Sequence, residues 1–443
     1  MNRLFCYKII IIFLFLAVLA ATLAAFWFFQ ESQKVLPDIY YYAPPDRSFV
    51  YSSEEITEFG FEEYIKEKVT HERQRLINEQ KSFIDLNLKQ MELALYEEGE
   101  ILKTFPVRSK GREGSWWETP PGVYFVGDKV VNHFSLISNV WMPYAVQFYG
   151  NFFMHGWPYY TGGKELPPGP SGGCIRMNTS DAGIIFEFAK RGMPVLVFEE
   201  KIDPALPALL PEEEITPFLG TKSEGLMVAD LKTGEIVLGK EIFSEIYAGP
   251  LVSAMMALTG SEIVNLERRI VAREWMFRGV EDKIIIPGRS YRGHDLLPIL
   301  LKGSKEAALT LSRFFTPEYF VIAMNTKAGA IGMDNTVFED VVGESQKNIT
   351  TLYDSAKMMR YILQYRGFLF DIENELRGKG VSLIPQNEQE NRETLETLFG
   401  FYKMKTPEGS LRNIFIAITN SPELDNDLET ILSWLENNLS LKQ

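Results

Sequence analysis

The chain has 443 residues, a net charge of −14 and a globular balance of 46% hydrophobic and 23% charged residues, which suits two or three domains with buried cores. The negative charge argues against nucleic acid as a partner, because phosphate binding needs clustered Lys and Arg. The chain contains only two cysteines, Cys6 and Cys174, and four histidines. This composition excludes a disulfide framework and disfavours a structural zinc site. No cofactor is expected.

The N-terminal region carries an almost unbroken apolar run over residues 9–29. A helix of that length, at about 1.5 Å per residue, can cross the hydrocarbon core of a bilayer. Arg3 and Lys8 precede the run, so the positive-inside rule places the chain start in the cytoplasm. A cleaved signal peptide is the alternative, but the apolar run continues past the small residues at 21–25. We expect residues 1–30 to be a cytoplasmic tip and a single-pass membrane anchor, with the remaining chain outside the cytoplasm.

The next stretch, residues 31–80, predicts an extended stalk rich in Pro and Tyr, followed by a charged helix over 54–80. Residues 81–200 then change to short alternating segments with turn signals, which predict an all-β meander containing one helix. The expected strands are 83–88, 90–95, 101–107, 123–126, 145–154 and 195–198, and the expected helix is 181–190.

Residues 201–222 contain four prolines and an acidic run, which is typical of a linker. Residues 223–443 mix short strands with helices, so the sequence predicts a second, α+β domain. The expected strands there are 226–230, 319–324 and 413–418, and the expected helices are 251–259, 295–301, 304–314, 355–364 and 425–438.

Cys174 is the strongest candidate for covalent chemistry. A lone cysteine is most often a small buried hydrophobe, but the Pro- and Gly-rich segment 167–173 before it cannot form a helix or a central strand. Gly172 and Gly173 allow the backbone to approach a substrate closely and its N–H groups to converge, as an oxyanion hole requires.

A thiol nucleophile needs a base, because the thiolate is the reactive form. His155 ends a strand-like run and precedes Gly156, a position from which a rigid element presents a side chain to a cleft. The alternative is a structural histidine. His133 and His71 are weaker candidates for the base.

The motifs at 118–124 (ETPPGVY), 153–156 (FMHG) and 171–177 (SGGCIRM), in this order and spacing, resemble an L,D-transpeptidase catalytic domain of the YkuD type. The resemblance implies a bacterial, β-rich enzyme that uses a Cys–His pair. It implies attack on the peptidoglycan stem peptide at the carbonyl of its third residue, release of the terminal D-alanine and transfer of the acyl group to an amine.

Carried over to this sequence, the resemblance implies that Cys174 is the nucleophile, His155 the base and the Gly156 carbonyl the group that orients the imidazole. The N–H groups of Gly173 and Cys174, with Gly172, would hold the oxyanion. Arg176 and Ser171 fall on the substrate side, where Arg176 either holds a substrate carboxylate or packs structurally. Many family members have His at the position of Gly172, so substrate positioning is expected to differ there.

Residues 225–420, with motifs at 229–237 and 320–338, resemble a serine-type D-alanyl-D-alanine carboxypeptidase of the penicillin-binding class, with a β-lactamase-like fold. That chemistry needs a Ser-x-x-Lys pair, which occurs nowhere in this chain. Pro250 and Ser253 occupy the two positions, the Ser-x-Asn element reads Gly-Ser-Lys at 303–305, and the Lys-Thr-Gly element reads Lys-Thr-Pro at 405–407. We expect a non-catalytic domain that binds stem peptides or a cell-wall protein, or serves as a spacer.

Taken together, the sequence predicts a membrane-anchored, multidomain peptidoglycan L,D-transpeptidase. The competing readings are an L,D-carboxypeptidase that uses water as acceptor and a non-catalytic wall-binding or regulatory protein. A Cys amidase or protease acting on another substrate is the least favoured.

Overall fold

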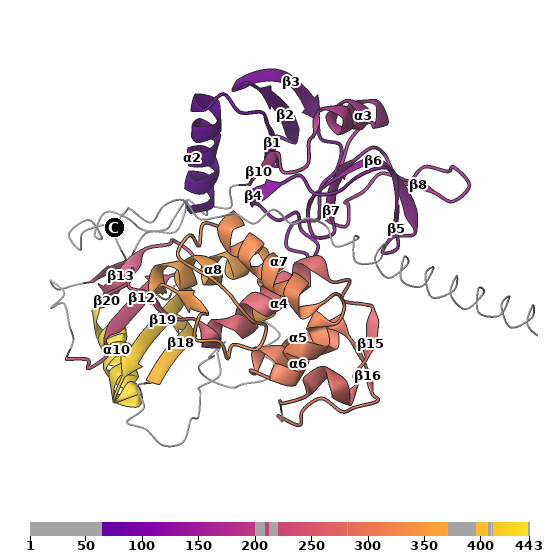
Figure 1. The fold of residues 1–443 in the computed structure, drawn as a ribbon. Coiled ribbons are helices and arrows are strands. Elements are labelled where there is room, and N and C mark those ends of the chain that lie inside the picture. The colour runs from indigo at the N-terminus through magenta and orange to yellow at the C-terminus, as the bar shows by residue number, and fades with distance from the viewer. Residues whose placement is uncertain are drawn as a thin grey trace, which may run out of the picture. The chain divides into compact units, whose positions relative to one another are not determined.

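The computed structural model describes residues 64–199, 209–211, 220–280, 282–370, 396–405, 409 and 411–441 (Figure 1). The expected membrane anchor at 1–30, the stalk and the start of the helix expected at 54–80 lie outside these ranges. Within the described ranges, no helix is long and apolar enough to cross a membrane.

The first domain begins with helix α2 (Tyr64–Asn78) and a five-stranded sheet of order β3-β2-β1-β10-β4. Five of the expected strands are confirmed, but the expected meander is wrong, because the strands do not all pair with their neighbours in the sequence. Strand β1 pairs in parallel with β10, with Ile84 opposite Val195, and a parallel pair needs a long crossover, which the second sheet provides here. The strands are β1 (Phe83–Asn87), β2 (Glu92–Glu97), β3 (Glu100–Pro106), β4 (Gly122–Phe125) and β10 (Pro194–Phe198).

The second sheet has the order β5-β6-β7-β9, with β8 paired to β6. The single strand expected at 145–154 is wrong, because the chain turns at Gly150, whose φ is +47°, and forms a hairpin. Strand β7 runs parallel to β9, and the expected helix at 181–190 is confirmed as α3, which packs on β6. The elements are β5 (Lys129–Ser135), β6 (Val140–Tyr149), β7 (Phe152–His155), β8 (Tyr159–Tyr160), β9 (Ile175–Arg176) and α3 (Thr179–Phe188).

The second domain is built on a four-stranded antiparallel sheet of order β13-β12-β19-β18. Alternation along β12 and β19 places one set of side chains in a buried cluster with α10 and the other set in the buried cluster that includes α4 and α8. The expected strands at 226–230 and 413–418 are confirmed. The strands are β12 (Gly225–Asp230), β13 (Ile236–Lys240), β18 (Glu396–Lys405) and β19 (Leu411–Ser421).

All five helices expected in the second domain are confirmed, and a sixth replaces the strand expected at 319–324. That apolar, β-branched run is helical because Thr316 caps the helix, its Oγ1 accepting from the N–H of Tyr319 at 3.2 Å, and Pro317 occupies the first helical position. The helices are α4 (Val252–Ile263), α5 (Gly293–Leu301), α6 (Lys305–Ser312), α7 (Pro317–Ala330), α8 (Leu352–Tyr365) and α10 (Leu424–Asn438).

Short elements complete the described chain. Most of the expected linker lies outside the described residues, but part of it forms β11, which pairs with β20. The short elements are β11 (Leu209–Pro211), β14 (Ile246–Tyr247), η1 (Gly249–Leu251), β15 (Arg269–Val271), η2 (Glu274–Phe277), β16 (Ser290–Arg292), β17 (Ile349–Thr350) and β20 (Leu439–Leu441).

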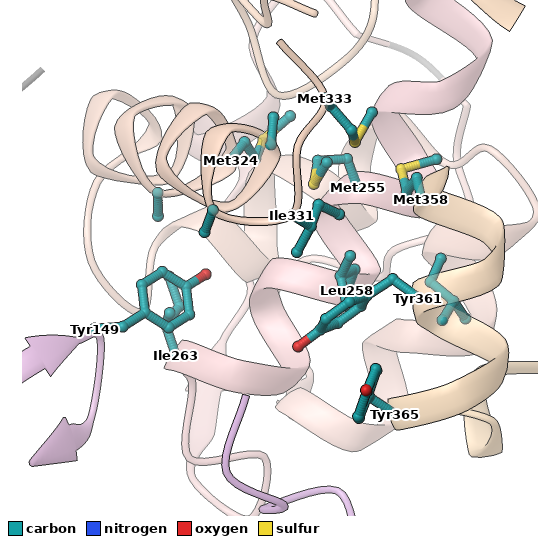
Figure 2. Packing of buried hydrophobic residues seen from close by; sticks show 14 of the residues in the cluster. Tyr149, Met255, Leu258, Ile263, Met324, Ile331, Met333, Met358, Tyr361 and Tyr365 are labelled. Atoms are coloured by element: carbon teal, nitrogen blue, oxygen red, sulfur yellow. The ribbon is translucent and has the colours of Figure 1, made fainter. Parts of the chain in front are cut away.

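The largest hydrophobic core is continuous through both domains. It joins side chains of β1, β4 and β6 to those of α4, α7 and α8. Figure 2 shows part of it, with Tyr149 of the first domain beside Ile263 at the end of α4, and Tyr361 and Tyr365 of α8 nearby. The two domains therefore share buried surface instead of being separate bodies on a tether.

Candidate active site

The turn that carries Cys174 depends on one glycine. Gly173 has a φ of +99°, and a Cβ there would lie 2.3 Å from Cε1 of Phe152 and 2.8 Å from the carbonyl oxygen of Trp117. Both the backbone conformation and the space therefore require glycine. Gly172 is exposed, and a Cβ there would meet nothing within 4 Å, so a side chain at that position would point into open space.

Ser171 closes this turn from inside. Its Oγ accepts the N–H of Gly173 at 3.0 Å and donates to the carbonyl of Cys174 at 2.5 Å. The side chain is buried, so its hydroxyl serves the turn instead of the substrate face expected from the sequence. The Gly173 N–H is likewise engaged. In the described part of the chain, no hydrogen bond is found to the N–H groups of Gly172 and Cys174, which are the donors that the geometry leaves for an oxyanion.

Thr119 holds the same turn from the neighbouring segment. Its Oγ1 donates to the carbonyl of Gly173 at 2.8 Å and accepts from the N–H of Gly111 at 3.0 Å. Thr119 lies in the motif at 118–124, but the sequence predicted no role for it. Its role rests on contacts with two other segments of the folded chain, so no signal in the sequence could have identified it.

The thiol of Cys174 is protonated in this environment. Its Sγ donates to the carbonyl of Asn151 at 3.6 Å. Burial raises the pKa of the thiol to about 11, which the N–H of Phe153 and the positive charge of Arg176 only partly offset. A nucleophilic role for this thiol would therefore need a base that takes its proton.

His155 is the candidate for such a base. It ends β7 directly opposite Arg176 of β9, and Cys174 lies just before β9, so adjacent parallel strands bring the two residues together. Its Nδ1 lies 2.7 Å from the carbonyl of Gly156, the contact that the resemblance implies. This bond places the proton on Nδ1 and leaves the lone pair of Nε2 available.

The charge state of His155 follows from its burial, since only 2% of its surface is exposed. Burial lowers its pKa to about 4; the Gly156 carbonyl opposes this shift, and the charges of Arg176 and His133 add to it. At neutral pH the imidazole is therefore neutral, as a general base must be. His133, on β5, stacks on Phe153 at 4.8 Å, and burial lowers its pKa as well.

Arg176 supports the segment before Cys174. Its Nη1 donates to the carbonyls of Gly169 at 3.2 Å and Pro170 at 3.3 Å, and its guanidinium lies over the ring of Trp157. The side chain is buried. Of the two roles considered from the sequence, these contacts favour structural packing.

The described residues at which the second domain departs from the carboxypeptidase motifs lie in turns and at the ends of helices and strands. Pro250 lies in the short turn η1, and Ser253 lies in the first turn of α4. Ser304 caps α6 and donates to Asp282, while Lys405 ends β18 and residues 406–407 lie outside the described ranges. Among the described residues of the whole chain, no group of three or more His, Cys, Asp or Glu could hold a metal ion.

Two family models match the chain. Residues 81–197 match the L,D-transpeptidase catalytic domain (YkuD), and residues 251–405 match the D-alanyl-D-alanine carboxypeptidase family. A D-alanyl-D-alanine endopeptidase of Escherichia coli (strain K12) is 26% identical over 149 residues, 32% of this chain and 48% of that protein. A protein of the same name from Pseudomonas aeruginosa is 27% identical, with the same coverage. The chain thus spans about half the length of these curated relatives.

Solved structures similar to the chain come from both families. A D-alanyl-D-alanine carboxypeptidase from Mycobacterium tuberculosis H37Rv has 20% identity and a TM-score of 0.42, over 52% of this chain and 95% of its own. An L,D-transpeptidase from Stackebrandtia nassauensis has 23% identity and a TM-score of 0.24, over 30% of this chain and 68% of its own.

Proposed function

Because residues 81–197 belong to the L,D-transpeptidase catalytic-domain family and residues 251–405 to the D-alanyl-D-alanine carboxypeptidase family, we propose that this protein is a peptidoglycan L,D-transpeptidase. It acts through an acyl-enzyme on Cys174 and takes part in cell-wall cross-linking or remodelling. The observation that supports the proposal is that His155 ends β7 and Cys174 directly precedes β9, the strand paired with β7, next to a turn that requires glycine at position 173.

The mechanism follows from the charge states of the two groups. The Nε2 of neutral His155 takes the thiol proton as Sγ attacks the carbonyl carbon of the third stem residue. The N–H groups of Gly172 and Cys174 receive the oxyanion. When the bond to D-alanine breaks, the imidazolium returns its proton to the leaving amine. An acceptor amine then attacks the thioester, His155 takes a proton from it, and Cys174 leaves.

The test is to incubate the full-length protein in detergent with purified muropeptides and to identify the products by mass spectrometry. We expect cross-linked dimers and released D-alanine, both lost in Cys174→Ala and nearly lost in His155→Ala. A carbapenem should add its mass to Cys174. Shortened peptides without dimers would assign water as the acceptor. Dimers formed by Cys174→Ala, or a carbapenem adduct on another residue, would overturn the proposal.

The second domain is proposed to be non-catalytic, because Ser-x-x-Lys is absent from the chain. Fluorescent penicillin should leave residues 223–443 unlabelled, and labelling there would contradict this.

We also propose that residues 9–29 anchor the protein in the bacterial cytoplasmic membrane. Alkaline phosphatase fused after residue 40 should then be active in cells, and an inactive but stable fusion would place the domains inside.

A further inference from the structure

Helix α4 of the second domain ends against the loop that accepts a hydrogen bond from the thiol of Cys174. A Cβ on Gly150 would lie 2.6 Å from Cγ2 of Ile263, so the loop and the helix end are in close contact. The side-chain amide of Asn151 donates to the carbonyl of Ile263. The backbone carbonyl of the same Asn151 accepts from the thiol of Cys174. One residue therefore connects the second domain to the nucleophile.

A second connection runs through Arg366, directly after α8. Its Nη2 donates to the carbonyl of Glu118 at 3.0 Å and lies 2.9 Å from Oε1 of Glu262. The residue after Glu118 is Thr119, which holds the carbonyl of Gly173. Two segments that surround Cys174 are thus each held by a group from the second domain.

Both connections meet at Glu262, one residue before Ile263. Its two oxygens contact Arg366 and, at 2.8 Å, the ammonium of Lys327, and all three side chains are fully buried. The ammonium of Lys327 also donates to the phenol oxygen of Tyr124 at 3.1 Å and lies 5.3 Å from the ring centre of Tyr149, both in the first domain. Figure 2 shows Tyr149 beside Ile263 among the buried hydrophobic residues. A buried carboxylate with two cationic partners has little freedom to move, because each charge depends on the others for compensation.

We infer that the carboxypeptidase-like domain completes the transpeptidase site, with Glu262 and Arg366 acting as positioning residues that hold segments 118–119 and 149–151 around Cys174. This inference rests on the proposed function. It assigns the second domain a role other than spacer or peptidase.

The experiment compares two interface variants with a matched control in the full-length protein. Arg366→Lys keeps the charge but cannot reach both Glu262 and the Glu118 carbonyl, and Asn151→Ala removes the bond to Ile263 while keeping the carbonyl that faces the thiol. The control is Arg412→Lys, because Arg412 forms a buried ion pair with Asp230 at 3.1 Å within the second domain's own sheet. For each variant we would measure the melting temperature, the carbapenem acylation rate and the pH profile of Cys174 alkylation by iodoacetamide.

In both interface variants we expect carbapenem acylation to fall at least about tenfold, the change produced by roughly 1.4 kcal/mol. The alkylation midpoint should at the same time move below the parent value, because a loosened turn admits water to a thiol whose pKa is raised by burial. Arg412→Lys should lower the melting temperature but leave acylation and the alkylation profile within about twofold of the parent.

Acylation and alkylation profiles unchanged in Asn151→Ala would overturn the inference, even if Arg366→Lys failed to fold. Equal losses in Arg412→Lys would overturn it too, because they would reflect general destabilisation. If the parent protein took no carbapenem, the proposed function would fail. The alkylation profile would still test the positioning, since iodoacetamide needs only a thiolate and no substrate site.

Discussion

Acidification is expected to destabilise this protein through His155. In the unfolded chain the imidazole binds a proton near its ordinary pKa of 6.5, whereas in the folded protein burial lowers that pKa to about 4. Between these values the unfolded state holds more protons, so the free energy of unfolding rises with pH. The contribution of the neutral imidazole to the free energy of unfolding is fully present above pH 6.5 and is lost as the pH falls towards 4. The pKa difference corresponds to about 3 kcal/mol.

The assay is urea unfolding, monitored by tryptophan fluorescence, of the parent protein and of His155→Gln at several pH values from 4 to 8. Gln cannot titrate, so subtracting the variant's unfolding free energy removes the contributions of all other groups that titrate alike in both proteins. We expect this difference to decrease by about 3 kcal/mol from pH 7.5 to pH 4. A difference that stays constant within about 0.5 kcal/mol would refute the buried, neutral imidazole.

The same property sets the acid limit of catalysis. If neutral His155 is the base, the carbapenem acylation rate of the free enzyme should persist on acidification until pH about 4, where the imidazole becomes protonated. An acid limb near the ordinary pKa of histidine would show that the imidazole is hydrated in solution.

Four further outcomes are expected around the turn. Gly173→Ala should lower carbapenem acylation at least about a hundredfold, because its Cβ would meet the ring of Phe152 at 2.3 Å; an unchanged rate would contradict this geometry. Gly172→His should leave the melting temperature unchanged, since a Cβ there meets nothing within 4 Å, while changing the KM for muropeptides, and a folding defect would refute it. Thr119→Val should slow acylation about tenfold through loss of the bond to Gly173, and Thr119→Ser should restore the rate. Alkylation of Cys174 by iodoacetamide should speed up about tenfold per pH unit from 7 to 10, because the thiol pKa is about 11; a plateau near pH 8 would argue against that value.

The sequence predicted the parts of the site whose chemistry is local. Cys174, Gly173 and His155 each lie in a short motif whose residue types suggested their candidate roles, whereas the clash with Phe152 that requires glycine at position 173 depends on the fold. The charge states could not be predicted, because burial raises the pKa of the thiol and lowers that of the imidazole. Burial depends on how distant segments pack. The role of Ser171 could not be predicted either, because its hydrogen-bond partners come together only in the closed turn.

The fold was predictable where one local signal dominated and failed where two competed. The run 319–324 has the β-branched and aromatic residues of a strand, but the cap at Thr316 followed by Pro317 made it helix α7. That error also concealed Lys327, which lies on the same helix with its ammonium fully buried beside Glu262. No periodicity within α7 reveals this ion pair, because its partner comes from α4.

If the second domain completes the site around Cys174, helix α4 explains how that domain can lack peptidase residues and still support chemistry in the first. Pro250, where the peptidase nucleophile would stand, lies just before the helix begins, whereas Glu262 and Ile263 end it. Twelve helical residues separate the two ends by about 18 Å. Substitutions at the first end therefore leave the contacts of the second end untouched. A buried carboxylate left without its cations is costly, so the end that faces Asn151 and Arg366 tolerates change least. The inferred positioning of Cys174 thus depends on the end of α4 away from Pro250, and substitutions near Pro250 should leave it unchanged.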